Sequence, residues 1–385
     1  MRPPIDPLPG FPYMRFARGP AMNQPHSLTQ SGMPAADPGL FGAAGALDLS
    51  YAGADALPRL EETLAARYGV PRERIFVAPG ASGAMAVVAA ALFRPGVRVA
   101  VEAPTYEPLR VLPQRAGAEV REIRRTHAGR WRLDPDAVGA ALAGARRGHV
   151  FFTTPHNPSG FRTSPADLRA LAQHAADAGG YLISNEIYEE FVEPSKAVRA
   201  ATLVENGISI GSLTKAYGLS GLRLGWVVLG ERAASEREAF EDAVFLQLVD
   251  LPTTCLRAGR FAFEQRASLI APYARILAES KPVFERWLER EPRLRVHVPV
   301  DGLIAFGEVP GVPDTLALSR HLAQAEQLAV VPGEFFGAPG HLRLGFGSPP
   351  ERLSEALTRL SRGLASYTLA PQGRPGRLDP APPVA

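Results

Sequence analysis

The sequence has few of the features that mark secreted or membrane proteins. Its single cysteine, Cys255, excludes an intramolecular disulfide, and the reducing cytosol is the usual compartment of such chains. The most apolar segment, residues 83–93, is too short to span a bilayer and is followed by Arg-Pro-Gly. Proline interrupts the first sixteen residues every few positions, unlike a secretory signal. We therefore expect a cytoplasmic protein without a membrane segment.

Clusters of basic residues without acidic neighbours are also missing. The pI is about 9.1, but the formal net charge is only +3. Arginines alternate with acids in stretches such as residues 121–125 and 236–242. Such mixtures are typical of a solvated face and argue against a nucleic-acid surface. We predict no metal site.

The proportions of hydrophobic and charged residues are typical of a globular protein. Hydrophobic residues make up 46% of the 385 residues and charged residues 21%. A chain of this length accommodates one large domain with a lobe, or two domains.

Short apolar runs alternate with helical stretches over the first 230 residues. The runs lack polar alternation, as expected of strands covered on both faces. Strand and helix in alternation predict an α/β fold with a mostly parallel sheet and helices on both faces. The expected strands are residues 74–78, 97–104, 149–155, 181–188, 208–213 and 222–230, and the expected helices are 83–92, 106–117, 134–147 and 164–180.

The rest of the chain predicts a smaller α+β lobe. The pattern turns helical from about residue 231, and residues 252–289 suggest one long helix. A strand-rich segment, a helix near 314–328, strands at 328–333 and 341–347 and a helix from 350 follow. We expect an N-terminal arm (1–45) packing partly on the small lobe, a large domain (46–280), a small domain (281–367) and a disordered tail (368–385).

Lysine is nearly absent. The chain has only Lys196, Lys215 and Lys281, so 39 of its 42 basic residues are arginine. Lys215 lies in GSLTKAYGLSGLRLGW (211–226), just ahead of an apolar run. Such a lysine often extends to solvent. A desolvated lysine can instead form a Schiff base with an aldehyde cofactor, and Ser212 and Arg223 are near enough in sequence to bind its phosphate.

This stretch resembles the lysine motif of the class I and II aminotransferases, which are fold type I enzymes dependent on pyridoxal 5'-phosphate (PLP). The resemblance, of the aspartate-aminotransferase type, extends over roughly residues 30–365, with further motif matches in the same order. It implies a seven-stranded, mostly parallel sheet enclosed by helices, with a smaller C-terminal lobe. It also implies PLP held by Lys215 as an internal aldimine, amino acid and 2-oxo acid substrates, and a homodimer with shared active sites.

The segment APGASGAM (78–85) predicts an anion site. A strand ends at a glycine turn and a helix begins, so backbone N–H groups and the helix dipole face the anion. Such turns are also common as structural joints. The resemblance places Ala81 and Ser82 on the cofactor phosphate, which Ser212 and Arg223 could also reach. It matches Tyr51 to a tyrosine that crosses a dimer interface to the phosphate of the partner subunit.

Tyr106 and Asn157 follow expected strands, and Tyr188 ends another. The first two have ordinary structural alternatives. An aromatic residue in EAPTYEP could pack in the core, and Asn-Pro-Ser-Gly is also a turn signature. By resemblance, Tyr106 stacks on the pyridine ring, and Asn157 and Tyr188 hydrogen-bond its hydroxyl group. Asn157 is also expected to lie beside the substrate.

Two residues are matched to substrate recognition. Arg343, in LRLGFG, resembles the arginine that pairs with the substrate α-carboxylate, although a strand arginine usually lies at the surface. Gly32, in HSLTQSGMP, resembles the point where an N-terminal segment approaches the substrate most closely.

Asn185 departs from the family pattern Asp-Glu-x-Tyr, because the chain reads SNEIY. The family aspartate keeps the pyridine nitrogen protonated, whereas an amide has no charge with which to do so. Glu186 points to the opposite face of the strand and offers no substitute. Either the chemistry is diverted from transamination, or Asn185 hydrogen-bonds an unprotonated nitrogen while transamination proceeds more slowly.

The expected function is therefore a PLP-dependent aminotransferase, with Lys215, Tyr188 and Asn185 as its catalytic residues. Arginine could not replace Lys215, because it is almost always charged and is not nucleophilic. The alternative is a PLP-dependent lyase, cyclase or decarboxylase on the same fold, which Asn185 favours. A non-catalytic PLP-binding protein is a third reading, although residues 1–30 are too short and proline-rich for the helix-turn-helix segment of such proteins.

Overall fold

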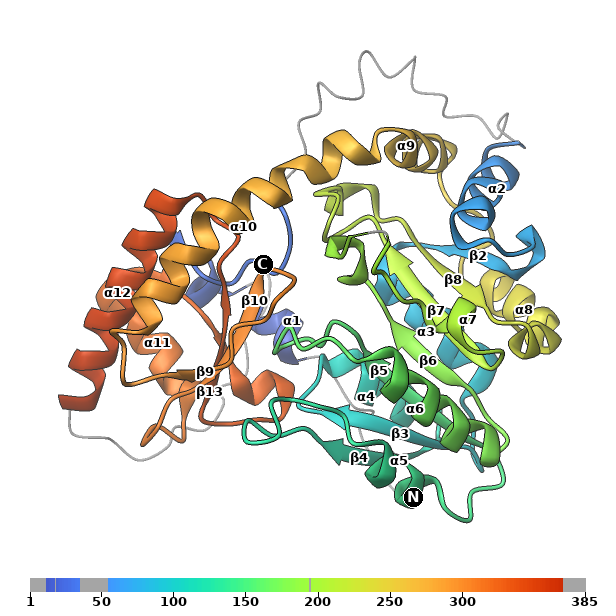
Figure 1. Ribbon diagram of the computed structural model, residues 1–385, viewed down its shortest axis with the longest axis horizontal. Helices are drawn as coiled ribbons and strands as arrows, with labels where there is room; N and C mark the ends of the chain where they lie inside the picture. The colour runs from blue at the N-terminus through green and yellow to red at the C-terminus, as the bar shows by residue number, and fades with distance from the viewer. Residues whose placement is uncertain (1–11, 18, 35–54, 194, 370–385) are drawn as a thin grey trace, which may run out of the picture. The chain divides into compact units, whose positions relative to one another are not determined.

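The computed structural model describes residues 12–17, 19–34, 55–193 and 195–369 (Figure 1). These residues form two compact units. The first lies within residues 32–157 and 161–273, and the second within residues 12–31, 158–160 and 274–369. The domain boundaries expected from the sequence stay a prediction.

The first unit is built on a seven-stranded sheet with the order β2-β8-β7-β6-β5-β3-β4 (Figure 1). Neighbouring strands from β4 to β7 are parallel, and β8 runs antiparallel to both β7 and β2. The predicted mostly parallel α/β sheet is therefore confirmed. The strands are β2 (Ile75–Ala78), β3 (Arg98–Ala103), β4 (Glu119–Arg124), β5 (Gly148–Thr153), β6 (Leu182–Asn185), β7 (Gly207–Ser212) and β8 (Gly225–Leu229).

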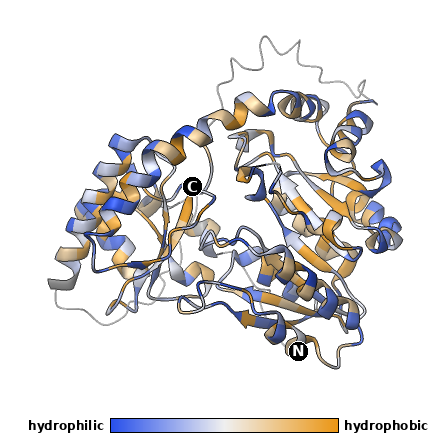
Figure 2. Ribbon diagram, in the orientation of Figure 1, coloured by the Kyte–Doolittle hydropathy of each residue, from blue (hydrophilic) through white to orange (hydrophobic). Residues whose placement is uncertain are grey.

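Helices contact both faces of this sheet, which explains the unbroken apolar runs seen in Figure 2. On one face, Val150 and Phe152 of β5 join a buried cluster with residues of α5 (Pro135–Leu142), α6 (Pro165–Asp177) and α7 (Ala200–Leu203). On the other face, the alternate residue Phe151 contacts Phe93, next to α3, at 5.7 Å between ring centroids. Helix α3 (Gly80–Leu92) contacts β2, β7 and β8 and packs on α8 (Arg237–Gln247).

The predicted start of helix α6 is confirmed. Ser164 Oγ accepts a hydrogen bond from the backbone N–H of Asp167 at 3.0 Å, and Pro165 occupies the first helical position. Helix α4 (Glu107–Arg115) follows β3, and α2 (Ala56–Tyr68) precedes β2.

Two sequence expectations need correction. Strand β4 was not predicted, because only one of its residues, Ile123, is buried and the other five positions are polar or half-exposed. This composition suits an edge strand, which pairs on one side only. The single long helix expected over residues 252–289 is two helices, α9 (Thr253–Glu264) and α10 (Arg266–Leu288), separated at Gln265.

The second unit contains an antiparallel sheet of order β12-β13-β10-β9 and a parallel pair formed by β1 with β11. Helix α11 (Thr315–Glu326) packs on α12 (Pro350–Leu369) and contacts β11. This unit also includes α1 (Pro12–Ala17). Its strands are β1 (His26–Ser27), β9 (Arg295–Val296), β10 (Ile304–Glu308), β11 (Leu328–Ala329), β12 (Val331–Pro332) and β13 (His341–Gly345).

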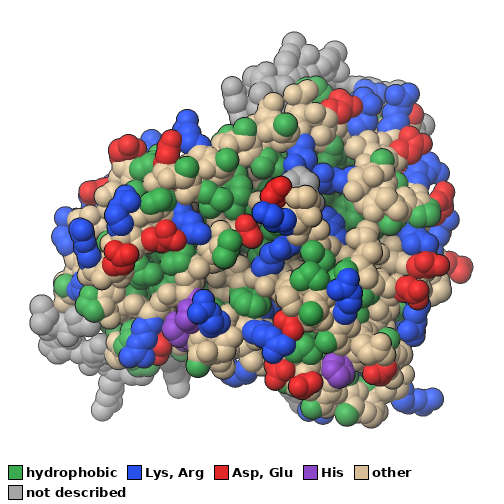
Figure 3. Space-filling model, in the orientation of Figure 1, with side chains coloured by type: hydrophobic (Ala, Val, Ile, Leu, Met, Phe, Trp, Pro, Cys, Tyr) green, Lys and Arg blue, Asp and Glu red, His purple; other side chains and the backbone are tan. Residues whose placement is uncertain are grey.

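The surface in Figure 3 shows acidic and basic side chains interspersed, in line with the mixed charge pattern of the sequence. Among the described residues, no helix combines the length and hydropathy that crossing a membrane requires.

Candidate active site

One edge of the seven-stranded sheet collects most of the predicted site residues. Strands β3, β5, β6 and β7 all end at this edge, as does β2, and β8 begins there because it runs in the opposite direction. The register pairs Thr153 with Asn185 and Ser212 with Gly225. The carboxyl edge of a parallel sheet is the usual place for a ligand in such folds.

The amino end of α3 and Arg223 form an anion-binding arrangement. Gly80, at φ +74°, starts the helix immediately after β2, and a Cβ there would lie 2.6 Å from Arg223 Nη2. The first backbone N–H groups of a helix have no acceptor within the helix, and the N-cap residue Pro79 offers none from its side chain. The N–H groups, the helix dipole and the guanidinium together favour an anion. Ala81 is buried in this turn and Ser82 is exposed.

Strand β8 packs closely against the same turn. A Cβ on Gly225 would lie 2.5 Å from the Gly80 carbonyl carbon and 2.8 Å from the Ala81 nitrogen. Ser212, at the end of β7, donates a hydrogen bond to the Leu224 carbonyl oxygen at 3.0 Å. This bond joins the end of β7 to the residue before β8, beside the first turn of α3.

Lys215 follows β7 by three residues and is half-buried. Its carbonyl oxygen accepts a hydrogen bond from the Met33 N–H at 2.8 Å. Gly32 lies so close that a Cβ there would be 3.0 Å from Lys215 Cα and 3.1 Å from its Cδ. The segment that contains Gly32 therefore contacts the lysine, while its predicted role beside a substrate stays a prediction.

Other predicted residues lie at or just beyond the same strand ends. Tyr106 precedes α4 and is half-buried, and Asn157 lies in the turn that follows β5 with 5% exposure. Tyr188, between β6 and the 3-10 turn η4 (Glu189–Phe191), is 2% exposed. Their predicted contacts to a ligand stay predictions.

Asn185 is the last residue of β6 and is 1% exposed. Its Nδ2 donates to Met85 Sδ at 3.8 Å, on the face that carries α3. Its Oδ1 is buried and has no hydrogen-bond partner among the described residues. The neighbouring Glu186 points to the opposite face, where Oε1 accepts from the Ala200 N–H and Ser209 Oγ at 2.7 and 2.9 Å.

Two predicted residues lie elsewhere. Tyr51 falls outside the described residues. Arg343 belongs to the second unit, on β13, and is 2% exposed rather than a surface residue. Its Nη2 donates to Tyr13 Oη at 3.2 Å and to the Thr29 carbonyl oxygen at 3.1 Å. Its guanidinium carbon also lies 5.3 Å from the ring centroid of Phe336.

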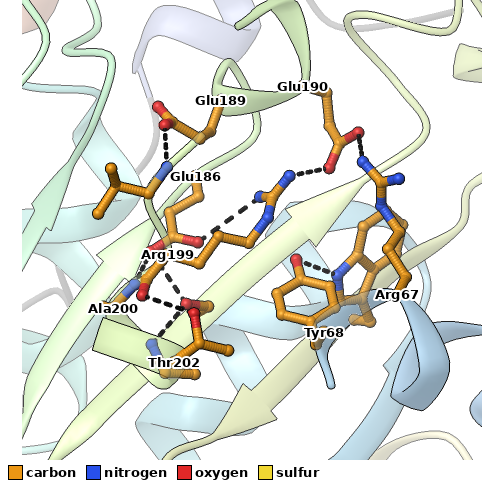
Figure 4. A network of polar contacts seen from close by, with 12 residues as sticks. Arg67, Tyr68, Glu186, Glu189, Glu190, Arg199, Ala200 and Thr202 are labelled. Carbon is orange, nitrogen blue, oxygen red and sulfur yellow. Dashed lines mark hydrogen bonds and ion pairs between the residues drawn. The ribbon is translucent and has the colours of Figure 1, made fainter. Parts of the chain in front are cut away.

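A buried charge network that the sequence did not reveal contacts the lysine segment through Tyr217. Figure 4 shows its members Arg67, Glu190 and Arg199. Tyr217, two residues beyond Lys215, donates from its hydroxyl to Glu190 Oε2 at 2.7 Å. The same oxygen accepts from Arg67 of α2 at 2.5 Å, and Arg199 binds the other oxygen. Burial opposes ionisation of Glu190, but Arg199, Arg67 and Tyr217 outweigh it and hold the pKa of Glu190 below its ordinary value.

Replacing Glu190 with glutamine should lower the free energy of unfolding by about 3–5 kcal/mol, since Arg67, Arg199 and Arg266 lose a buried anionic partner. Urea denaturation measures this change. Glu193→Gln is the matched control, because Glu193 pairs with Lys196 at the exposed surface and its loss should leave stability unchanged. Equal midpoints for Glu190→Gln and wild type would refute a supporting role for the network.

Met85 and Thr214 were also missed. Thr214 Oγ1 contacts Ser212 Oγ, and the Thr214 N–H donates to that oxygen at 3.1 Å. Thr214 could have been found from the sequence, because Ser212 and Thr214 are two hydroxyl residues just before Lys215. Nothing in the sequence linked Met85 to Asn185, which lies 100 residues further along.

Comparison with known proteins matches residues 33–360 to the family described as aminotransferase class I and II. Capreomycidine synthase of Streptomyces vinaceus is 31% identical over 351 residues, which are 89% of this chain and 88% of the relative. Arginine–pyruvate transaminase AruH of Pseudomonas aeruginosa is 29% identical over 311 residues, covering 76% of this chain and 75% of the relative. The structure of the PLP-dependent cyclase OrfR superposes with a TM-score of 0.76 at 25% identity, covering 95% of this chain and 99% of OrfR.

The residues at the sheet edge fit the cofactor of these proteins. PLP needs a site for its phosphate, an amine for its aldehyde and a partner for its ring nitrogen. The start of α3 with Arg223, the amine of Lys215 and the buried Oδ1 of Asn185 are groups of these three kinds. The chain belongs to the class I and II aminotransferases, the PLP-dependent family of fold type I.

Proposed function

We propose that this chain is an aminotransferase acting on an L-amino acid and a 2-oxo acid, with PLP bound through Lys215. The observation that carries this proposal is the position of Lys215. It follows β7 at the sheet edge where the start of α3 and Arg223 favour an anion. The similarity to arginine–pyruvate transaminase supports the same reaction class.

In this proposal each side chain at the edge has one task toward the cofactor. The phosphate would be bound by backbone N–H groups of α3, by Arg223, and by the hydroxyl of Ser212 once it turns from the Leu224 carbonyl oxygen. Tyr106 would stack on the ring, Asn157 and Tyr188 would hydrogen-bond its hydroxyl group, and Asn185 would face its nitrogen. PLP, when bound, supplies a sink for the electrons released at the substrate's α-carbon.

The remaining tasks concern the substrate. Lys215 Nζ removes the proton from the α-carbon as a general base and returns a proton later as a general acid. Arg343 binds the α-carboxylate with its planar guanidinium and so fixes the orientation of the amino acid. Gly32, whose segment lies against Lys215, leaves room beside the lysine because it has no side chain.

A second candidate is a PLP-dependent cyclase, lyase or decarboxylase on the same fold. Asn185 favours it, because an amide holds the ring nitrogen protonated less strongly than a carboxylate does. The similarity to capreomycidine synthase and to the cyclase OrfR supports it as well. Both candidates begin at the substrate's α-carbon, with loss of a proton or of a carboxylate. They are therefore distinguished by their products and not by this step.

A product screen distinguishes the two candidates. The purified holoprotein is incubated with each proteinogenic L-amino acid in the presence of 2-oxoglutarate or pyruvate. A new 2-oxo acid, formed with transfer of the amino group to the acceptor, supports transamination. A cyclised product, a released side-chain fragment or CO2 without acceptor consumption supports the second candidate. A holoprotein whose visible spectrum and amino acids both stay unchanged would refute both.

Replacing Asn185 with aspartate should speed removal of the α-proton. A carboxylate stabilises a protonated ring nitrogen more than an amide does, and one pKa unit corresponds to a factor of about ten in the protonation equilibrium. We expect deuterium wash-in at the α-carbon of a substrate amino acid to rise up to about tenfold. An unchanged or slower exchange would contradict this account of position 185.

We further propose a cytoplasmic homodimer in which Tyr51 reaches the cofactor phosphate of the partner subunit. Exposed apolar side chains near the end of α8 support an interface, with exposures of 63% for Phe245 and 87% for Leu246. Light scattering of the purified protein measures its mass in solution.

A further inference from the structure

The side-chain amide of Asn185 has a defined orientation, and Met85 provides the reason. Both residues are 1% exposed. Asn185 Nδ2 donates to Met85 Sδ at 3.8 Å, and Oδ1 has no hydrogen-bond partner among the described residues. The contact joins the end of β6 to the second turn of α3.

Chemistry distinguishes this orientation from its reverse. A thioether sulfur has no hydrogen to donate and is a weak acceptor. It can therefore receive the amide N–H2 group but offers nothing to the amide oxygen. If the amide turned over, its oxygen would face the sulfur and the N–H2 group would lose this acceptor. A buried carbonyl oxygen without a partner is costly, so Oδ1 marks a place that suits a hydrogen-bond donor.

We propose that Met85 holds the Asn185 amide so that Oδ1 accepts a hydrogen bond from the protonated pyridine nitrogen of PLP. The inference rests on the proposed function, in which Asn185 faces that nitrogen. An unprotonated nitrogen would set its lone pair against those of Oδ1, whereas a protonated one donates a charge-assisted hydrogen bond. A neutral amide thereby favours the protonated ring, though less strongly than a carboxylate does. Met85 is a positioning residue, because it acts on the ring only through Asn185.

The protonation state can be measured directly. The protein is loaded with PLP labelled with 15N in the ring, and the 15N chemical shift of the holoprotein is recorded at neutral pH. Labelled PLP free in acid and in alkali provides the protonated and unprotonated references. We expect the wild-type shift to lie between the two references, because an amide holds the proton on the ring nitrogen less strongly than a carboxylate does. Met85→Leu keeps a buried side chain of similar volume without the sulfur, so the amide can turn and the shift should move toward the unprotonated reference.

Met22→Leu is the matched control, because it makes the same replacement at a half-buried methionine of the second unit, which has no proposed role toward the cofactor. Its shift should equal that of wild type, whereas the shift of Asn185→Asp should move to the protonated reference. An unprotonated wild-type shift overturns the inference without any variant, and so does an unmoved shift in Met85→Leu. Failure to take up labelled PLP overturns the proposed function as well, whereas uptake and turnover with an unprotonated ring overturn this inference alone.

Discussion

Replacing Lys215 with alanine should abolish the PLP adduct that borohydride fixes on the peptide containing residue 215. It should also slow α-proton exchange by about 10²- to 10⁴-fold, the usual contribution of a general acid-base group. Both effects follow from the proposed function, in which one amine binds the cofactor and moves the proton. Mass spectrometry of the reduced protein measures the first effect, and deuterium wash-in measures the second.

The two other lysines are natural controls. Lys196 pairs with Glu193 at the surface, and Lys281 Nζ donates to the Val300 carbonyl oxygen at 3.1 Å. Alanine at either position should leave the adduct and the exchange rate unchanged. An adduct that persists in Lys215→Ala would show that another amine holds the cofactor and would remove the basis of the proposed function.

Replacing Arg343 with glutamine should lower kcat/KM for the amino acid substrate by about 30- to 3,000-fold. Loss of one partner of a buried, hydrogen-bonded charge pair costs about 2–5 kcal/mol, and 1.4 kcal/mol is a factor of ten. The Tyr13 hydroxyl, the Thr29 carbonyl oxygen and the Phe336 ring hold the guanidinium in place before a substrate arrives. A group held in this way loses little conformational freedom on binding.

The decisive comparison is between an amino acid and the amine that lacks its carboxylate. If Arg343 binds the carboxylate, the variant should lose activity toward the amino acid but not toward the amine. Arg295→Gln is a control in the same unit, since Arg295 is exposed and pairs with Glu308 at 3.6 Å. Equal losses for both substrates would mean that Arg343 stabilises the fold and does not recognise the carboxylate.

The sequence predicted the central strands of the sheet because both of their faces are buried. It missed β4, where only Ile123 is buried, because an edge strand is too polar for its hydrophobic pattern to be visible. It also joined α9 and α10 into one helix. The break at Gln265 is marked by neither proline nor glycine, which are the signals that sequence reasoning depends on.

For the site, the sequence predicted residues that belong to recognisable motifs. Each of them lies a few residues from a strand end. Lys215 follows β7, Asn157 follows β5 and Arg223 precedes β8. The roles of Met85 and Glu190 depend on contacts between segments far apart in the chain, such as Glu190 with Arg67, and no motif encodes such a contact. Local patterns therefore identified the strand ends, and folding was needed to show which side chains support them.

The reversed direction of β8 has a consequence for how such enzymes diversify. Because β7 ends and β8 begins at the same edge, one short loop contains both Lys215 and the arginine beside α3. Recombination between related genes would transfer these two residues together, whereas Asn185 lies on a separate strand and can be exchanged alone. On the proposed function, a substitution at position 185 alone would change the basicity of the ring nitrogen and leave Lys215 and Arg223 unchanged.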